Sequence, residues 1–129
     1  MLFTDSNFWI SLFCEKEENH ARAAGLNKEF EHENLLLSEH ALGEIFTLIL
    51  KRYGKLRAFE VSQAVLEEPT LEIVQAGENE WREALELGKK FGFSFCDCLT
   101  LAQMRSNLIK KIISFDSDFD RVAGVQRIC

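Results

Sequence analysis

The chain has 129 residues, of which 47% are hydrophobic and 28% are charged. This size and balance predict a single globular domain over residues 1–129 and exclude a disordered chain. The net charge of −6 argues against a protein that only coats nucleic acid, and no stretch approaches the ~18 apolar residues of a membrane span.

The N-terminus is the first region that bears on localisation. It has no basic segment, and Asp5 interrupts its apolar start, so we expect no secretory signal peptide and a cytoplasmic protein. The four cysteines form no Cys-x-x-Cys pair. Small buried side chains or free thiols are therefore expected, rather than a zinc site or a disulfide framework.

Short apolar runs alternate with helical patterns through the first half of the chain. Ser38 is placed to cap one helix, Gly54 to break it, and Pro69 to end the helix after it. The predicted elements are a strand over 1–5, helices over 6–16 and 19–33, a strand over 34–38, and helices over 39–53 and 55–68.

The second half of the chain continues this alternation. Gly92 is placed to stop one helix and Ser94 to cap the next. The predicted elements are a strand over 70–75, helices over 78–92 and 95–107, a strand over 110–115, an acidic turn, and a last strand over 125–128. Strands that alternate with helices predict an α/β fold, a three-layer α/β/α sandwich with a mostly parallel central sheet.

Four acidic residues are predicted to meet at one edge of this sheet. Asp5 follows the first strand, and Asp116 follows a late one. Asp97 lies in the first turn of a helix, and Glu44 lies on a helix that is apolar around most of its circumference. Ligands of open α/β sheets bind outside the carboxyl ends of the strands. We therefore expect one acidic pocket, although a single aspartate after a strand is more often a turn or capping residue.

An all-carboxylate pocket favours a divalent cation. Carboxylates that lie close together raise one another's pKa values, and a bound cation removes that repulsion. Oxygen ligands without histidine or cysteine favour Mg²⁺ or Mn²⁺ over zinc. Asp118 and Asp120 add carboxylates beside Asp116. Such a site supports metal-assisted hydrolysis of a phosphodiester, with one ion or two.

The sequence resembles the PIN-domain ribonucleases, in particular the VapC-type toxins of prokaryotic toxin–antitoxin systems. The segments that carry the resemblance are FTDSNFWISLF, SEHALGEIFTLI, FSFCDCLTLAQM and IISFDSDFDRVAGVQRI. By this resemblance, Asp5, Glu44, Asp97 and Asp116 match the family's catalytic metal-binding quartet, Asp118 matches a further metal-binding acid, and Asn7 and Ser114 match supporting polar residues.

The resemblance also implies an activity and partners. The activity is Mg²⁺- or Mn²⁺-dependent endonucleolytic cleavage of RNA, which leaves a 5′-phosphate and a 3′-hydroxyl. The partners are a second copy of the chain, in a homodimer, and a cognate antitoxin protein. One departure from the family is Cys98, which stands where alanine is usual. Cysteine is small and apolar enough to pack similarly, so we expect activity to be kept.

A basic segment is the candidate RNA-binding surface. Its members are Lys51, Arg52, Tyr53, Lys55 and Arg57. The basic side chains are expected to contact phosphates while Tyr53 stacks on a base. The alternative interpretation is a solvated helix end whose basic residues complement the helix dipole.

Two other classes of function stay open at this point. A non-catalytic module would keep the PIN-like fold for RNA binding or protein interaction, although all four acids are present. An RNA-processing nuclease would keep the catalysis without an antitoxin. A haloacid-dehalogenase-like phosphatase is disfavoured, because it needs an aspartate two residues after its nucleophile, where this chain has Asn7.

Overall fold

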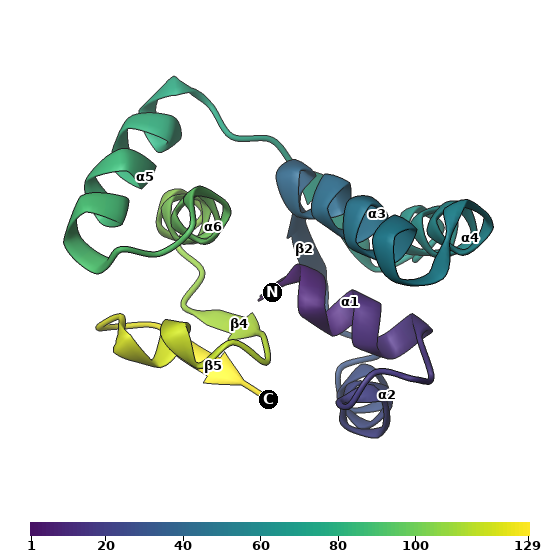
Figure 1. The fold of residues 1–129 in the computed structure, drawn as a ribbon. Helices are drawn as coiled ribbons and strands as arrows, with labels where there is room; N and C mark the ends of the chain where they lie inside the picture. Colours follow the sequence, from purple (N-terminus) through teal and green to yellow (C-terminus); the bar gives the residue numbers. More distant parts are fainter.

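The computed structural model describes residues 1–129 as an α/β sandwich around a five-stranded sheet (Figure 1). The strand order is β3-β2-β1-β4-β5, and every neighbouring pair is parallel. The strands are β1 (Leu2–Thr4), β2 (Leu35–Ser38), β3 (Leu71–Val74), β4 (Lys111–Ile113) and β5 (Gln126–Ile128). The predicted fold class is confirmed, and the sheet is parallel throughout.

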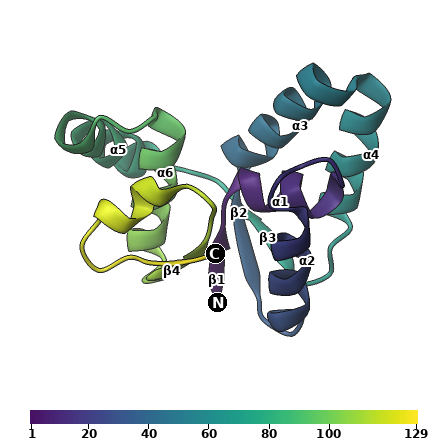
Figure 2. The same ribbon diagram turned by 60° about the horizontal axis from the view of Figure 1, so that its bottom comes forward.

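Helices cover both faces of the sheet (Figure 2). They are α1 (Ser6–Phe13), α2 (His20–Glu29), α3 (Glu39–Tyr53), α4 (Lys55–Leu66), α5 (Glu78–Phe91), α6 (Phe95–Ser106) and the short 3₁₀ helix η1 (Ser117–Arg121). The first four pack on one face, and α5, α6 and η1 pack on the other. None of these helices combines the length and the apolar character that crossing a membrane requires.

Alternation along the strands divides the core into two clusters. In β2, Leu35 and Leu37 pack in the cluster beneath α1 to α4, whereas Leu36 packs in the cluster beneath α5 and α6. In β4, Ile113 and Ile112 divide in the same way. Because successive strand side chains point to opposite faces, a fully apolar strand has to be covered on both sides.

The connections between strands create a switch point beside β1. The chain passes from β1 to β2 and β3 on one side, and then crosses back through α5 and α6 to β4 on the other side of β1. In open parallel sheets, ligands bind in the crevice outside the carboxyl ends of the strands at such a point. The acidic residues that follow β1 and β4 therefore lie where a ligand site is expected.

Two helices end three or more residues earlier than the sequence pattern indicated. α1 ends at Phe13 rather than at residue 16, and α2 ends at Glu29 rather than at residue 33. The residues beyond each end are mainly charged or polar and are largely exposed. They bury little apolar surface, and packing of an apolar face supplies most of the stability of a short helix.

Of the two serines predicted to cap helices, one does so and the other does not. Ser94 caps α6 by accepting a hydrogen bond from the Asp97 amide at 3.2 Å, as expected. Ser38 occupies the N-cap position of α3 without capping it, because its buried hydroxyl donates to the Gln103 side chain on α6. Cys98, which replaces the family's usual alanine, is fully buried on α6.

Candidate active site

A pocket at the carboxyl ends of β1 and β4 gathers acids from four distant segments. Its volume is about 340 Å³, and Asp5, Glu44, Asp97 and Asp116 all line it. We call it the acidic pocket. A larger hollow of about 500 Å³ beside α5 and α6 is lined by acidic and basic side chains together, so it concentrates no charge of one sign.

Asp5 is the most buried of these acids, and both of its carboxylate oxygens accept hydrogen bonds. Its Oδ1 accepts from the Ser6 amide at 2.8 Å, which caps α1. Its Oδ2 accepts from the Ser114 hydroxyl at 2.8 Å and from Asn7 Nδ2 at 3.1 Å. The Asp5 amide in turn donates to the Ile113 carbonyl at 3.0 Å. Asp5 is therefore both a helix cap and a wall of the acidic pocket.

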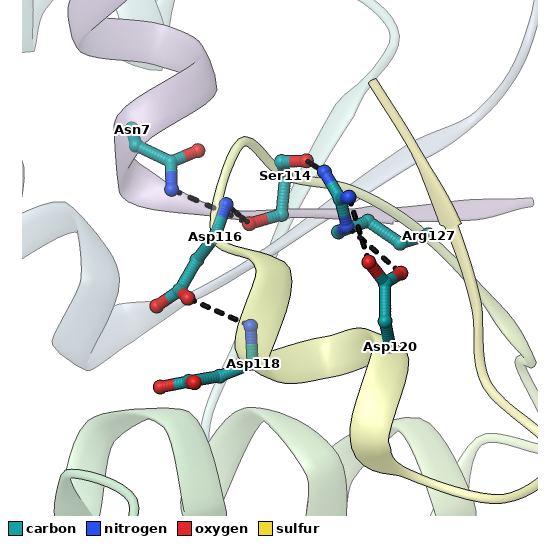
Figure 3. Close-up of polar contacts among 6 residues, drawn as sticks. All are labelled: Asn7, Ser114, Asp116, Asp118, Asp120 and Arg127. Atoms are coloured by element: carbon teal, nitrogen blue, oxygen red, sulfur yellow. Dashed lines mark hydrogen bonds and ion pairs between the residues drawn. The ribbon is translucent and has the colours of Figure 1, made fainter.

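The segment after β4 carries the next two acids (Figure 3). The Asp116 amide donates to the Ser114 hydroxyl at 3.0 Å, and the Phe115 amide donates to Asn7 Oδ1 at 3.1 Å. Asp116 Oδ1 accepts from the Asp118 amide at 2.9 Å and so opens η1. Asn7 and Ser114, the two predicted supporting residues, thus connect Asp5 to the backbone around Asp116.

Glu44 and Asp97 reach the acidic pocket from helices on opposite faces of the sheet. Glu44 Oε1 accepts a hydrogen bond from the Ser6 hydroxyl at 2.6 Å. Asp97 lies in the first turn of α6, and its carboxylate meets those of Asp116 and Asp118, with one oxygen of each lying within 4.8 Å of the others. The structure therefore brings the five predicted acids together, and their role as metal ligands stays a prediction.

Two of these carboxyl groups are hard to ionise in the metal-free protein. Burial raises the pKa of Asp5 to about 6, and the charges of Glu44 and Asp116 add to the rise, which hydrogen bonds partly offset. Burial also raises the pKa of Asp97 to about 7, and the charges of Asp5 and Asp116 add to it. Negative charge in the metal-free pocket is therefore opposed by burial and by repulsion between the acids, and a cation would offset both.

The side chains present fit a hard divalent cation. Mg²⁺ holds oxygen ligands at about 2.1 Å, so two oxygens on one ion lie at most ~4.2 Å apart. The oxygens of Asp97, Asp116 and Asp118 lie within 4.8 Å of one another, which requires only a small adjustment. Burial raises the pKa of the nearby Cys96 thiol to about 11, and Glu44 adds to the shift. In the metal-free protein Cys96 is therefore a neutral thiol beside the acids.

The raised pKa values predict how the stability of the metal-free protein depends on pH. Asp5 and Asp97 ionise near pH 3.8 in the unfolded chain but near 6 and 7 in the folded one. Between these values the folded state binds more protons, so rising pH destabilises it. We expect the unfolding free energy contributed by these groups to fall as the pH rises from about 4 to about 7.

Melting in chelator across pH 4.5 to 8 would measure this effect, with Asp97→Asn as the comparison. Burial lowers the pKa of His40 below its ordinary value, and this group acts in the opposite direction because the folded state binds fewer protons on it than the unfolded chain does. His40 is present in both proteins, so the difference between their melting temperatures isolates Asp97. The melting temperature of Asp97→Asn should rise relative to that of the wild type as the pH increases. A difference in melting temperature that is independent of pH would contradict the prediction.

The predicted RNA-binding segment lies at the end of α3 and the start of α4, and part of it reaches the acidic pocket. Arg52 lines that pocket together with Glu17. Its Nη1 donates to Glu17 Oε1 at 2.7 Å, and the Tyr53 hydroxyl donates to the same oxygen at 3.1 Å. Glu17 therefore orients both side chains, although nothing in the sequence marked it.

The other basic residues of this segment differ in their contacts. Arg57 donates to the Phe13 carbonyl at the end of α1 and pairs with Glu60 at 3.3 Å. Lys51 and Lys55 are exposed. The structure therefore separates two solvent-facing lysines from arginines that also hold neighbouring elements together.

A contact at the C-terminus also was not predicted. Arg127 on β5 donates from Nε and Nη2 to the two carboxylate oxygens of Asp120, at 3.0 and 2.8 Å. This bond from Arg127 lowers the pKa of Asp120. Asp120 is thus paired within the protein by a bidentate arginine, whereas Asp116 and Asp118 face Asp97 and Asp118 has only a longer ion pair with Arg121, at 4.0 Å. The only sign of this ion pair in the sequence is a basic residue in the last predicted strand.

Comparison with known proteins gives one family. The family model described as PIN domain matches residues 2–125. The 23S rRNA-specific endonuclease VapC20 of two Mycobacterium tuberculosis strains is 30% identical over 131 residues, covering 98% of this chain and 97% of that protein.

Solved structures share the fold. The crystal structure of M. tuberculosis VapC20, described as a sarcin–ricin loop cleaving toxin, has a TM-score of 0.85 at 24% identity and covers 95% of each chain. A toxin–antitoxin complex from Klebsiella pneumoniae has a TM-score of 0.72 at 16% identity, with 98% and 96% covered. VapBC2 from Rickettsia felis, bound to a fragment of promoter DNA, also has a TM-score of 0.72, at 13% identity with 99% and 98% covered.

Proposed function

The chain belongs to the PIN-domain family and is of its VapC type, and from this premise we propose that it is a metal-dependent endoribonuclease that acts as a toxin. The observation that carries the proposal is the acidic pocket, in which carboxylates from four distant segments meet at the carboxyl edge of the sheet. Every acid of the family quartet is present, which disfavours a non-catalytic module.

The residues of the pocket have separable tasks in this proposal. Asp97, Asp116 and Asp118 would hold the cation, Mg²⁺ or Mn²⁺, with Asp5 and Glu44 completing the negative wall. The bound cation would activate a water and stabilise the leaving oxygen of the phosphodiester. Ser6 holds the Glu44 carboxylate, and Ser114 and Asn7 hold that of Asp5. These hydrogen bonds fix the pocket before substrate arrives, which lowers the cost of ordering it during the reaction.

The relatives indicate which RNA to test first. VapC20 of M. tuberculosis is named a 23S rRNA-specific endonuclease, so we propose ribosomal RNA as the substrate class. The test is incubation of purified 23S rRNA with the protein, with Mg²⁺, with Mn²⁺ or with chelator. We expect discrete fragments with 5′-phosphate ends in the presence of metal. Intact RNA under all metal conditions, in a protein that folds, would contradict the proposal for this substrate.

The exposed lysines are proposed to contact the RNA backbone. The acidic pocket repels phosphate, so positive charge beside it is needed to hold the substrate. Replacing Lys51 and Lys55 with alanine is expected to weaken RNA binding and to lower the salt slope of log K by about one for each phosphate that the variant no longer neutralises. These lysines are exposed, so the fold should not change.

Titration of labelled RNA at several salt concentrations would measure both effects. The matched control is Lys110→Ala with Lys111→Ala. These two exposed lysines lie at the start of β4, at the amino ends of the strands and so away from the acidic pocket. An unchanged salt slope in the Lys51 and Lys55 variant would assign these residues to a solvated helix end. An equal effect in the control would show only a general charge effect.

The proposed function includes two protein partners and a cellular location. A cognate antitoxin is proposed, because similar folds occur in toxin–antitoxin complexes. A homodimer is proposed through the exposed apolar side chains of α3 and α4, which include Phe46, Leu50, Leu56 and Phe59. The cytoplasm is proposed as the place of action, since ribosomal RNA is found there.

A further inference from the structure

We infer that Arg127 is a positioning residue, which clamps both ends of residues 114–120 so that Asp116 and Asp118 are held ready for the cation. We call residues 114–120 the aspartate loop. The inference rests on the proposed function, because it concerns the affinity of the proposed metal site. Arg127 and Asp120 lie in the last segment that carries the resemblance, but neither is among the site residues that the resemblance implies.

Arg127 forms hydrogen bonds at both ends of the aspartate loop (Figure 3). Arg127 Nη1 donates to the Ser114 carbonyl at 3.3 Å, at the start of the aspartate loop. Its Nε and Nη2 donate to both oxygens of Asp120, at the end of the loop. A guanidinium supplies such a fixed fork of donors, whereas a lysine ammonium is a single flexible point of charge. One side chain therefore sets the distance between the two ends of the loop.

The backbone hydrogen bonds at the two ends of η1 are long, so the side-chain contacts of Arg127 add to what holds the aspartate loop in place. The Phe119 amide donates to the Asp116 carbonyl at 3.4 Å, and the Val122 amide donates to the Phe119 carbonyl at 3.3 Å. Phe119 is buried and anchors the loop one residue before Asp120. Arg127 itself is largely covered, with its side chain 15% exposed, and it projects from a strand that is paired with β4.

The position of the clamp links it to the metal site rather than to general stability. The loop is the part of the site that has to bring Asp116 and Asp118 within reach of Asp97 on α6, where the three oxygens lie within 4.8 Å of one another. Asp120 is exposed, so solvent screens its ion pair with Arg127 and limits what that pair contributes to folding. Replacing a residue that holds metal ligands in position, in contrast, commonly lowers metal affinity by about 10- to 100-fold.

The deciding experiment compares Mn²⁺ binding to the full-length protein and to Arg127→Lys, measured by titration calorimetry without RNA. This change keeps the charge and removes the fork. We expect the Kd for Mn²⁺ to rise about tenfold or more, with little change in melting temperature in chelator. RNA cleavage by the variant should fall at limiting Mn²⁺ and return at saturating Mn²⁺, which a general loss of folding would not produce.

Two more variants complete the design. Asp120→Asn should raise the Kd for Mn²⁺ similarly, and the double variant should be no weaker than the worse single variant, because the two residues act as one unit. The control is Arg105→Lys, which alters an arginine that pairs with Glu83 at 2.8 Å between α5 and α6. It should bind Mn²⁺ as the wild type does.

The outcomes separate this inference from the proposed function. If the wild-type protein binds no Mn²⁺, the proposed metal-dependent function itself fails. If the wild type binds Mn²⁺ and Arg127→Lys binds it equally well, the clamp is only a surface ion pair and the inference is overturned. If Arg127→Lys does not fold, Asp120→Asn decides the matter by the same comparison, with wild-type affinity again overturning the inference.

Discussion

Replacing Asp97 with asparagine is expected to lower RNA cleavage at saturating metal on the order of a hundred- to a thousandfold. The reason is that Asp97 faces Asp116 and Asp118 across the acidic pocket, where it would bind the cation through a charged oxygen. Metal ions contribute several kcal/mol to the stabilisation of charge in such reactions, and each ~1.4 kcal/mol is a factor of ten in rate. Asparagine keeps the volume of the side chain, so the fold should be kept.

The measurement is a time course of 23S rRNA cleavage in Mg²⁺ or Mn²⁺, with chelator as the blank. Glu86→Gln is the matched control, because it removes one negative charge from an exposed site on α5. The control should cleave at the wild-type rate. Cleavage by Asp97→Asn at that same rate would remove Asp97 from the catalytic set and would leave it as a residue of the first turn of α6.

Replacing Asp116 with asparagine is expected to leave the metal-free protein as stable as the wild type or more stable, and to remove much of the stabilisation that Mg²⁺ provides. The variant has one charge fewer in a crowded set of carboxylates. Its amide oxygen can still accept the hydrogen bond that Asp116 Oδ1 now accepts from the Asp118 amide at 2.9 Å. The turn that opens η1 should therefore persist, while the charged metal ligand is removed.

Thermal melting in chelator and across a Mg²⁺ titration measures both parts of this prediction. Stabilisation by a ligand follows RT ln(1 + [L]/Kd), which is roughly 2.7 kcal/mol at a hundredfold excess over Kd. The wild type should gain stability on this scale, and the variant should gain clearly less. Asp116→Ala is the companion variant, because it removes both the charge and the hydrogen bond of the turn. If Asp116→Asn melts far lower in chelator and gains as much from Mg²⁺ as the wild type, Asp116 is a structural turn residue.

Much of the local structure could be predicted from the sequence because its causes are local. Gly92 ends α5 with a φ of 72°, a conformation that glycine adopts without steric cost. Ser94 caps the next helix two residues later. The apolar runs of β2 and β4 indicate strands by their composition alone. Asp5 and Asp116 were also predictable as site residues, since each directly follows a strand of a parallel sheet and such sheets bind ligands at that edge.

Other features depended on contacts that no local pattern encodes. Ser38 had the sequence of a helix cap, yet its hydroxyl bonds to Gln103, 65 residues away. Arg52 and Tyr53 were predicted as solvent-facing RNA contacts, and the structure adds a shared bond to Glu17 on the loop after α1. In each case the short-range propensity was present, and a partner brought close by the fold took the hydrogen bond.

The sequence by itself determined the helices and strands, the fold class and the acids of the pocket, because periodicity, capping residues and strand-end carboxylates act over a few neighbouring positions. The resemblance also implied Asn7 and Ser114 as supporting residues, whereas only the tertiary structure revealed the contacts of Ser6 and Arg127. Arg127 meets Ser114 because β5 pairs with β4 at the edge of the sheet, and Ser6 meets Glu44 because α3 packs across α1. The physical reason is that a hydrogen bond needs its partners within about 3 Å, and strand order and helix packing set that distance between residues far apart in the chain.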